Sequence, residues 1–180
     1  MNFLLENDEY TVSGYYEFTG KMSSNTMITG FRGPTTIKFK DGSTIKFNAP
    51  DIKLGGMVMG ARTIECTGSL VFHDIANKLK GVVIFGTFKE SGFWEKTITG
   101  SKANITGLIY RLSDKNNIAP VFGKSQKLPT DLKDLKDIDK KPLCEIGGGY
   151  LSEITFDKRS YWNINTTVPA RQIPQTISQP

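Results

Sequence analysis

Histidine and cysteine are scarce in this 180-residue sequence, which contains one His and two Cys. Catalytic triads and histidine-based metal sites need an oriented histidine with partners, and His73 falls at the end of an expected hairpin. Cys66 and Cys144 form no zinc or redox motif. The sequence therefore predicts no enzymatic activity, no metal site and no cofactor.

Long apolar segments are also lacking. The longest wholly apolar run, Val82–Phe85, has four residues, whereas a transmembrane helix needs about 20. The N-terminus has no basic region and becomes acidic by Glu6, which is not typical of a signal peptide. We expect a cytoplasmic chain in a reducing compartment, without a transmembrane segment.

The net charge of +5 is modest and favours anionic surfaces without indicating a nucleic-acid binder. Lysines and aromatics interleave around Lys38, Phe39 and Phe47, which suits either a single-strand-binding platform or an ordinary hairpin with a solvated lysine face. The hairpin is the simpler interpretation, so no nucleic-acid partner is predicted. Gly147–Gly149 lacks the following Lys and Ser/Thr of a phosphate-binding loop.

Alternating apolar and polar residues indicate β-strands. Residues 35–40 and 43–48 alternate on either side of Asp41-Gly42, which is a strong hairpin signal. Ile37 and Phe39 then share one face. A second hairpin is expected from 69–73 and 81–88. Further strands are expected over 57–65, broken by Gly60, and over 103–112, broken by Gly107. This spacing, with no long helix, predicts a mainly β, antiparallel protein whose glycines allow a curved or closed sheet.

Residues 113–142 differ from the rest of the chain. Three prolines punctuate them, and eight of the eleven residues 131–141 are Asp or Lys. Thr130 could cap a short helix that carries Leu132, Leu135 and Ile138. This stretch is either a solvated insertion, the favoured interpretation, or a partner-docking helix. Residues 163–180 are rich in Pro, Gln, Thr and Asn and are predicted to be a disordered tail.

Six segments, in order, resemble the lipid-binding domain of the oxysterol-binding protein family. They are Gly20–Thr26, Gly55–Glu65, Gly68–Asp74, Phe88–Trp94, Asn104–Tyr110 and Gly149–Ile154. The resemblance covers about residues 3–162 and implies an incomplete antiparallel β-barrel with little helix. It also implies lipid binding, with transfer of a sterol or phospholipid between membranes.

The sequence departs from the family pattern at both ends. The EQVSHHPP hallmark, the N-terminal lid, the lysine-bearing KPxNP-type motif and the C-terminal helices are absent, so no phosphoinositide-contacting residue carries over. The expected partners are thus a sterol or phospholipid ligand and, peripherally, anionic membranes. A β-domain that mediates interactions without transport, or a truncated fragment without autonomous activity, is the alternative.

Candidate wall residues of the lipid tunnel follow from alternation and bulk. Each has ordinary core packing as its competing interpretation. The candidates are Tyr16, Phe18, Ile37, Phe39, Ile84 and Phe88. Such walls would hold the lipid by apolar burial, at about 25 cal/mol per Å².

Overall fold

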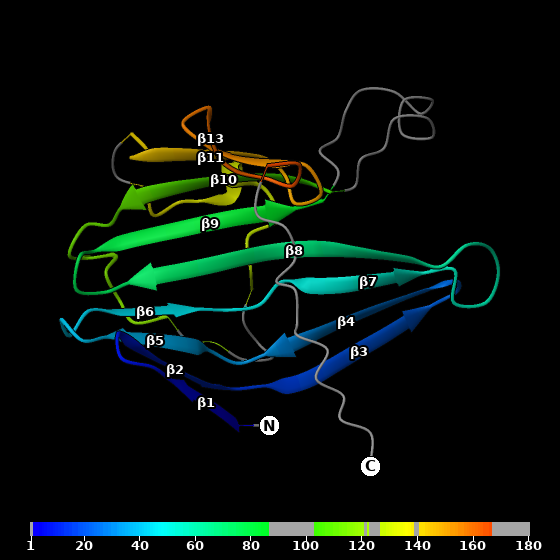
Figure 1. The fold of residues 1–180 in the computed structure, drawn as a ribbon, viewed down its shortest axis with the longest axis horizontal. Coiled ribbons are helices and arrows are strands. Elements are labelled where there is room, and N and C mark those ends of the chain that lie inside the picture. Colours follow the sequence, from blue (N-terminus) through cyan, green and yellow to red (C-terminus); the bar gives the residue numbers. More distant parts are fainter. Residues whose placement is uncertain (1, 87–102, 121, 123–126, 139–140, 167–180) are drawn as a thin grey trace, which may run out of the picture.

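One antiparallel sheet makes up most of the molecule (Figure 1). The computed structural model describes residues 2–86, 103–120, 122, 127–138 and 141–166. The sheet there contains thirteen strands, and the one helical segment is a single 3-10 turn, η1 (Leu132–Asp134). Within these ranges no helix is long and apolar enough to cross a membrane. The predicted mainly β class with little helix is confirmed.

The strands follow one another along the chain with short connections. Their bounds are β1 (Asn2–Glu6), β2 (Tyr10–Tyr15), β3 (Glu17–Ser23), β4 (Thr26–Arg32), β5 (Thr35–Phe39), β6 (Thr44–Phe47), β7 (Asp51–Gly55), β8 (Thr63–Asp74), β9 (Leu79–Phe85), β10 (Asn104–Arg111), β11 (Cys144–Gly149), β12 (Glu153–Phe156) and β13 (Arg159–Asn163).

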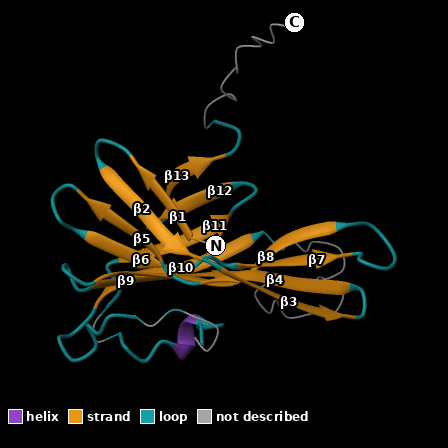
Figure 2. Cartoon of the chain, turned by 90° about the horizontal axis from the view of Figure 1, so that it is seen from below, coloured by secondary structure: helices purple, strands orange, loops and turns teal. Residues whose placement is uncertain are grey.

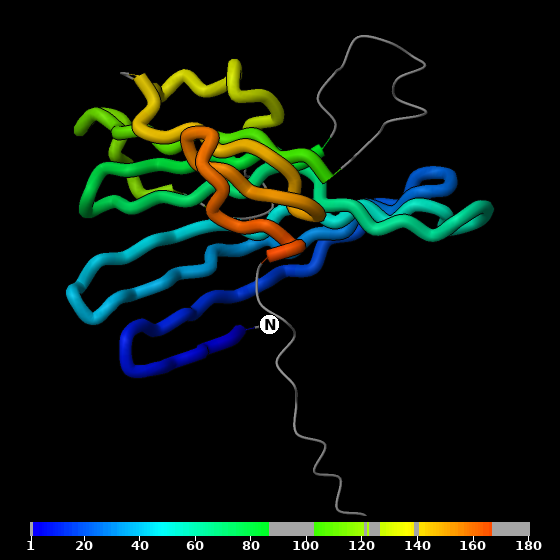
Figure 3. The backbone as a smooth tube through the Cα atoms, turned by 45° about the horizontal axis from the view of Figure 1, so that its top comes forward, coloured from blue at the N-terminus to red at the C-terminus, as the bar shows by residue number. Residues whose placement is uncertain are grey.

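The sheet branches at β8. The main sheet runs β1-β2-β5-β6-β8-β9-β10-β11-β12-β13, and its two end strands do not pair with each other. The N-terminal part of β8 pairs instead with β7, which continues to β4 and β3. We call β3, β4, β7 and residues 63–67 of β8 the wing. Figure 3 shows the wing extending beyond the main sheet.

Both hairpins expected from the sequence are present. β5 and β6 pair with Thr35 opposite Phe47 and Ile37 opposite Ile45, joined at Asp41-Gly42. Gly42 has a φ of +86°, a conformation that glycine adopts without strain. β8 and β9 pair with Val71 opposite Val82, and Lys78 has a positive φ in their turn.

Polar side chains mark the junction of the wing and the main sheet. Arg32 and Asp51 form a bidentate ion pair at 2.5 and 2.9 Å. The Asn48 side chain accepts a hydrogen bond from the Val71 amide and donates one to the Ser69 carbonyl. Because these contacts link β4 to β7 and the end of β6 to β8, they fix the point at which the strands leave one sheet for the other.

The main sheet has two covered faces. On one face, Val71, Val82, Ile84, Tyr110 and Leu112 form a buried cluster. On the other face, Val83, Ile105 and Ile146 form a second cluster. Figure 2 shows β1, β2, β12 and β13 rising on one side of the sheet and the segment with η1 lying on the opposite side. We call these the concave and convex faces, respectively.

The described residues 113–120 and 127–138 lie on the convex face. Leu128, Leu132, Leu135 and Ile138 pack against the buried cluster there. Asp137 accepts hydrogen bonds from Lys80 (2.5 Å) and Tyr110 (2.8 Å), which anchors the segment to β9 and β10. Charged residues such as Lys133 and Asp134 stay exposed. The segment therefore has an apolar inner side and a charged outer side.

Some local expectations were wrong. Residues 57–62 are a loop rather than a strand, because Gly56 and Gly60 adopt positive φ angles and β8 begins only at Thr63. Gly107 does not interrupt β10, which runs through it unbroken. The cap of η1 is Asp131 and not Thr130, and η1 is a single turn. Of the predicted tail, Asn163 ends β13, and 167–180 lie outside the described residues.

The junction ion pair generates a stability prediction. Asp51→Asn leaves the half-buried Arg32 guanidinium without its countercharge, so the free energy of unfolding should fall by about 1–3 kcal/mol. Urea denaturation followed by circular dichroism measures this change. Asp114→Asn, which removes the exposed pair with Lys78, is the control and should stay within about 0.5 kcal/mol of the parent. Equal losses of unfolding free energy in the two variants would show that the Arg32–Asp51 ion pair does not stabilise the junction.

A second prediction concerns how the stabilisation by Asp137 depends on pH. Burial by itself raises the pKa of Asp137, but hydrogen bonds from Lys80 and Tyr110, together with the Lys80 charge, outweigh it and hold the pKa below its usual value. A lowered native pKa stabilises the fold above the unfolded value of about 3.9, and this stabilisation is lost as the pH falls through the native pKa. The unfolding free energies of parent and Asp137→Asn should therefore differ at neutral pH and converge in acid. A constant difference would refute this role.

Candidate functional site

The concave face carries a continuous apolar surface from the main sheet into the wing. Side chains alternate along a strand, so positions 10, 12, 14, 16, 18, 20 and 22 lie on one side of the β2–β3 stretch. The register pairs this side with the odd-numbered positions of β4–β5, and Phe18 lies opposite Phe31. Those positions are 27, 29, 31, 35, 37 and 39. The alternate positions Lys21, Lys53 and Glu65 lie on the other face of the wing.

Aromatic rings cover the junction on this face. Tyr16 stacks on Phe3 with ring centroids 5.0 Å apart and lies 5.4 Å from Phe31. Phe18 contacts Phe31 edge-on at 5.9 Å. The Tyr16 hydroxyl and the Thr35 hydroxyl share a hydrogen bond of 2.7 Å. Two of the predicted wall residues, Tyr16 and Phe18, are thus brought into one cluster.

Two further predicted residues lie on the same face of the main sheet. Ile37 sits opposite Val12 and Ile45, and Phe39 sits opposite Tyr10, with ring centroids 6.1 Å apart. Both are half-buried. The register therefore joins Tyr16, Phe18, Ile37 and Phe39 on one surface.

Ile84 lies elsewhere. It pairs with Ser69, shares a face with Val82 and belongs to the buried cluster under residues 128–138. That is the convex face, so the structure does not bring Ile84 together with the other candidates. Phe88 lies outside the described residues.

The structure adds residues to the concave face that alternation and bulk did not select. Leu70 and Phe85 pack on its cluster, and the Phe72 ring lies over Gly81 in place of a side chain. Phe85 also contacts Tyr150 at 6.0 Å. The Tyr150 hydroxyl accepts a hydrogen bond from the Cys66 amide, 84 residues away. The alternation of apolar residues in β8 indicates Leu70 and Phe72, but not which face they share with Tyr150. That contact joins residues that are distant in sequence.

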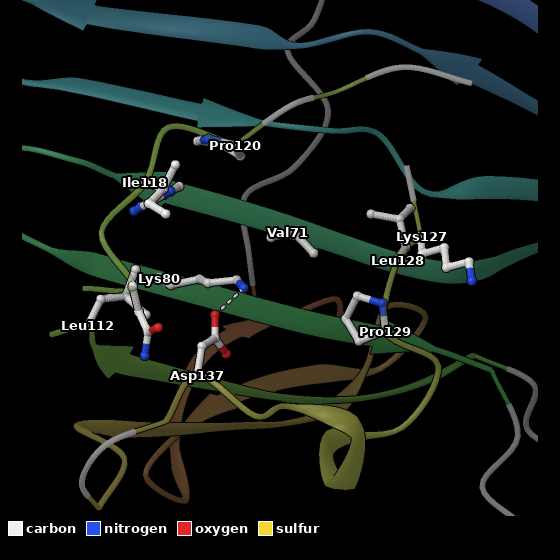
Figure 4. A pocket seen from close by; sticks show the side chains of 11 residues that line it. Val71, Lys80, Leu112, Ile118, Pro120, Lys127, Leu128, Pro129 and Asp137 are labelled. Carbon is white, nitrogen blue, oxygen red and sulfur yellow. Dashed lines mark hydrogen bonds and ion pairs between the residues drawn. The ribbon is translucent and has the colours of Figure 1, made fainter. Parts of the chain in front are cut away.

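A hollow of about 180 Å³ lies on the convex face, between the sheet and residues 116–120 and 127–137 (Figure 4). Val71, Leu112 and Pro129 line it together with Lys80 and Asp137, which are paired with each other. His73 is also at this hollow and hydrogen-bonds Asn117 at 3.0 Å. The polar groups of this hollow hold the segment to the sheet.

The potential metal ligands and the two thiols of the described residues lie apart from one another. No group of three or more described His, Cys, Asp or Glu residues could hold a metal ion. Burial raises the pKa of the Cys66 thiol, and burial with the Asp157 charge raises that of Cys144, so neither thiol is activated. The described surface is suited to apolar burial.

The fold is an antiparallel sheet that is not closed, and its concave face stays apolar from the main sheet into the wing. The family model of the oxysterol-binding protein matches residues 1–172, and the chain belongs to this family. It is 30% identical to Oxysterol-binding protein 9 of Dictyostelium discoideum over 97% of its length, and it spans 37% of that protein.

A solved structure shares the fold. The Osh3 ORD of Saccharomyces cerevisiae, crystallised in complex with PI(4)P, superposes with a TM-score of 0.61. The match covers 91% of this chain and 36% of that chain at 15% identity. The predicted oxysterol-binding-protein type of incomplete barrel is therefore confirmed.

We call Phe3, Tyr16, Phe18 and Phe31 the junction cluster. Removing one hydroxyl tests how much its hydrogen bond stabilises the fold. Tyr16→Phe removes the hydrogen bond to Thr35 and keeps the ring contacts, so the unfolding free energy should fall by about 0.5–1.5 kcal/mol. Tyr161→Phe is the control, because Tyr161 is 81% exposed. Urea unfolding measures both changes. A neutral Tyr16→Phe would show that the hydroxyl does not hold the junction.

Proposed function

We propose that the chain binds one sterol or phospholipid on the concave face and takes part in moving lipid between membranes. The observation that carries the proposal is the continuous apolar surface around Tyr16, Phe18, Ile37 and Phe39 in a member of the oxysterol-binding protein family. A lipid on this surface would remove apolar area from water on both sides, at about 25 cal/mol per Å². Transfer then needs no covalent step.

The exposed ring of Phe18, at the junction of the main sheet and the wing, supports the same proposal. Phe18 is 62% exposed although its ring lies against Phe31. A large ring left open beside a packed aromatic cluster is typical of a surface that takes an apolar ligand. Among the polar groups on this face, the hydroxyls of Tyr16 and Tyr150 are engaged within the protein, and the Thr29 hydroxyl is buried without a hydrogen-bond partner. The wall therefore suits an apolar lipid body better than a charged headgroup.

The rest of the functional assignment follows from the family and stays part of the proposal. The family and fold are those of lipid-binding domains rather than of known enzymes. The net charge of +5 favours peripheral attraction to anionic membranes, which would place the chain on their cytosolic side.

Sterol binding is the direct test. An intrinsically fluorescent sterol is delivered from cyclodextrin, without bilayers, and energy transfer from Trp94 and Trp162 reports binding. Phe18→Gln should weaken binding about fivefold, because part of one aromatic contact is lost. Lys38→Gln, on the convex side of β5, is the control and should leave binding unchanged.

The contrary results are also defined. Lack of saturable transfer from the parent chain would favour an interaction domain or a fragment without autonomous activity. Equal losses in Phe18→Gln and Lys38→Gln would place the sterol away from the concave face. Repeating the titration with a fluorescent phospholipid tells whether the ligand class is sterol or phospholipid.

A further inference from the structure

The far end of the wing exposes apolar side chains. The turn between β3 and β4 and the loop 56–62 between β7 and β8 meet there, at the right of Figure 1. We call these two connections, with Met22, the wing tip. Met22 is 61% exposed, Val58 69% and Met59 75%. Exposed side chains of this size contribute little to folding, so their presence together at the end of β3 and on the adjoining loop 56–62 points to an external apolar contact.

Loop 56–62 is held in one conformation. The Asn25 side chain accepts hydrogen bonds from the amides of Val58 (2.7 Å) and Met59 (2.9 Å) and donates one to the Met59 carbonyl (2.6 Å). The Asn25 carbonyl also accepts a hydrogen bond from the Met57 amide. The loop backbone is therefore fixed by a side chain of the neighbouring turn, while the side chains of Val58 and Met59 point outward into solvent.

Cations lie near the apolar tip, on the polar face of the wing and in loop 56–62. Lys21 and Arg62 are exposed, and Lys53 is half-buried on the polar face of the wing. Glu65, which sits opposite Lys53 in the register, is the nearby acidic residue on that face. The balance is positive, and each Lys or Arg near an anionic bilayer contributes about fivefold to binding.

We propose that the wing tip docks into anionic bilayers, with Met22, Val58 and Met59 entering the boundary between headgroups and acyl chains. The proposal rests on the proposed lipid-binding function and adds where the membrane contact is made. The wing tip projects from the molecule, with apolar side chains at its end and cations beside them. This arrangement fits a bilayer, whereas a protein partner would have to supply a matching pocket.

The wing gives the docked bilayer a continuous route to the concave face. Met22, Met27 and Leu54 are paired neighbours on the apolar face of the wing, and Phe18 and Phe31 follow on the same face. A lipid leaving the bilayer at the tip would meet apolar side chains from the tip to the junction cluster. The tip therefore connects the membrane to the proposed binding surface.

A fluorescent probe tests insertion. Met59→Cys is made in the full chain with Cys66→Ser and Cys144→Ser and labelled with an environment-sensitive dye. Vesicles of phosphatidylcholine with phosphatidylserine should shift its emission to the blue, and vesicles of phosphatidylcholine alone should do so less. Ile118→Cys, equally exposed at 72% on the convex side, is the matched control and should not respond. Equal shifts at both positions, or none at 59, would overturn the proposal.

Loss of docking is measured by vesicle co-sedimentation. Val58→Gln with Met59→Gln should weaken binding to the anionic vesicles at least about tenfold, while Ile118→Gln leaves it unchanged. Circular dichroism verifies that the variants fold. If the double variant binds vesicles like the parent, or if it only converts a dimer to a monomer in solution, the tip is not a membrane contact.

The two proposals fail separately. The double variant should keep the cyclodextrin-delivered sterol binding of the parent, because the tip is remote from the junction cluster. Parent binding to vesicles without any sterol or phospholipid binding would refute the proposed function and leave the tip assignment standing. Sterol binding without insertion of residue 59 would refute the tip assignment alone.

Discussion

The change of direction between the main sheet and the wing governs the rest of the molecule, and it depends on a few polar contacts. Two of the long strand stretches, β2–β3 and β4–β5, cross the junction with their alternation preserved, so one face stays apolar from end to end. Backbone groups freed where strands separate must find other partners. Asn48 satisfies those of β8, and Arg32 with Asp51 joins β4 to β7. These side-chain contacts, together with the strands that run through the junction, hold the wing against the main sheet and keep the apolar face continuous.

The two faces of the main sheet are used differently. The convex face is closed by residues 128–138, whose leucines cover the cluster around Val82 and whose Asp137 is tied to Lys80 and Tyr110. The concave face is lined by aromatic rings, several of them partly open, and it is the side on which we propose that the ligand binds. The packing that gives stability and the surface proposed for binding are therefore on opposite sides of the same strands.

Alternation and turn chemistry predicted much of this architecture from the sequence. The Asp41-Gly42 hairpin came from such local signals, and so did the shared face of Ile37 and Phe39. Ile84 shows where local reasoning ends. Val82, Val83 and Ile84 are buried although they face alternate sides of the sheet, so the run has no polar positions that tell the two faces apart. The loop at 56–62 was also missed, because its conformation depends on Asn25, which lies more than thirty residues earlier.

Asn25 has a consequence for how this protein can vary. Because the asparagine fixes the backbone of the loop through main-chain groups, the fold depends little on the identities of the exposed Val58 and Met59. Replacements at these two positions can thus accumulate at little cost to stability as long as Asn25 is kept. The wing tip is therefore a place where related chains can acquire different surface preferences on an unchanged scaffold.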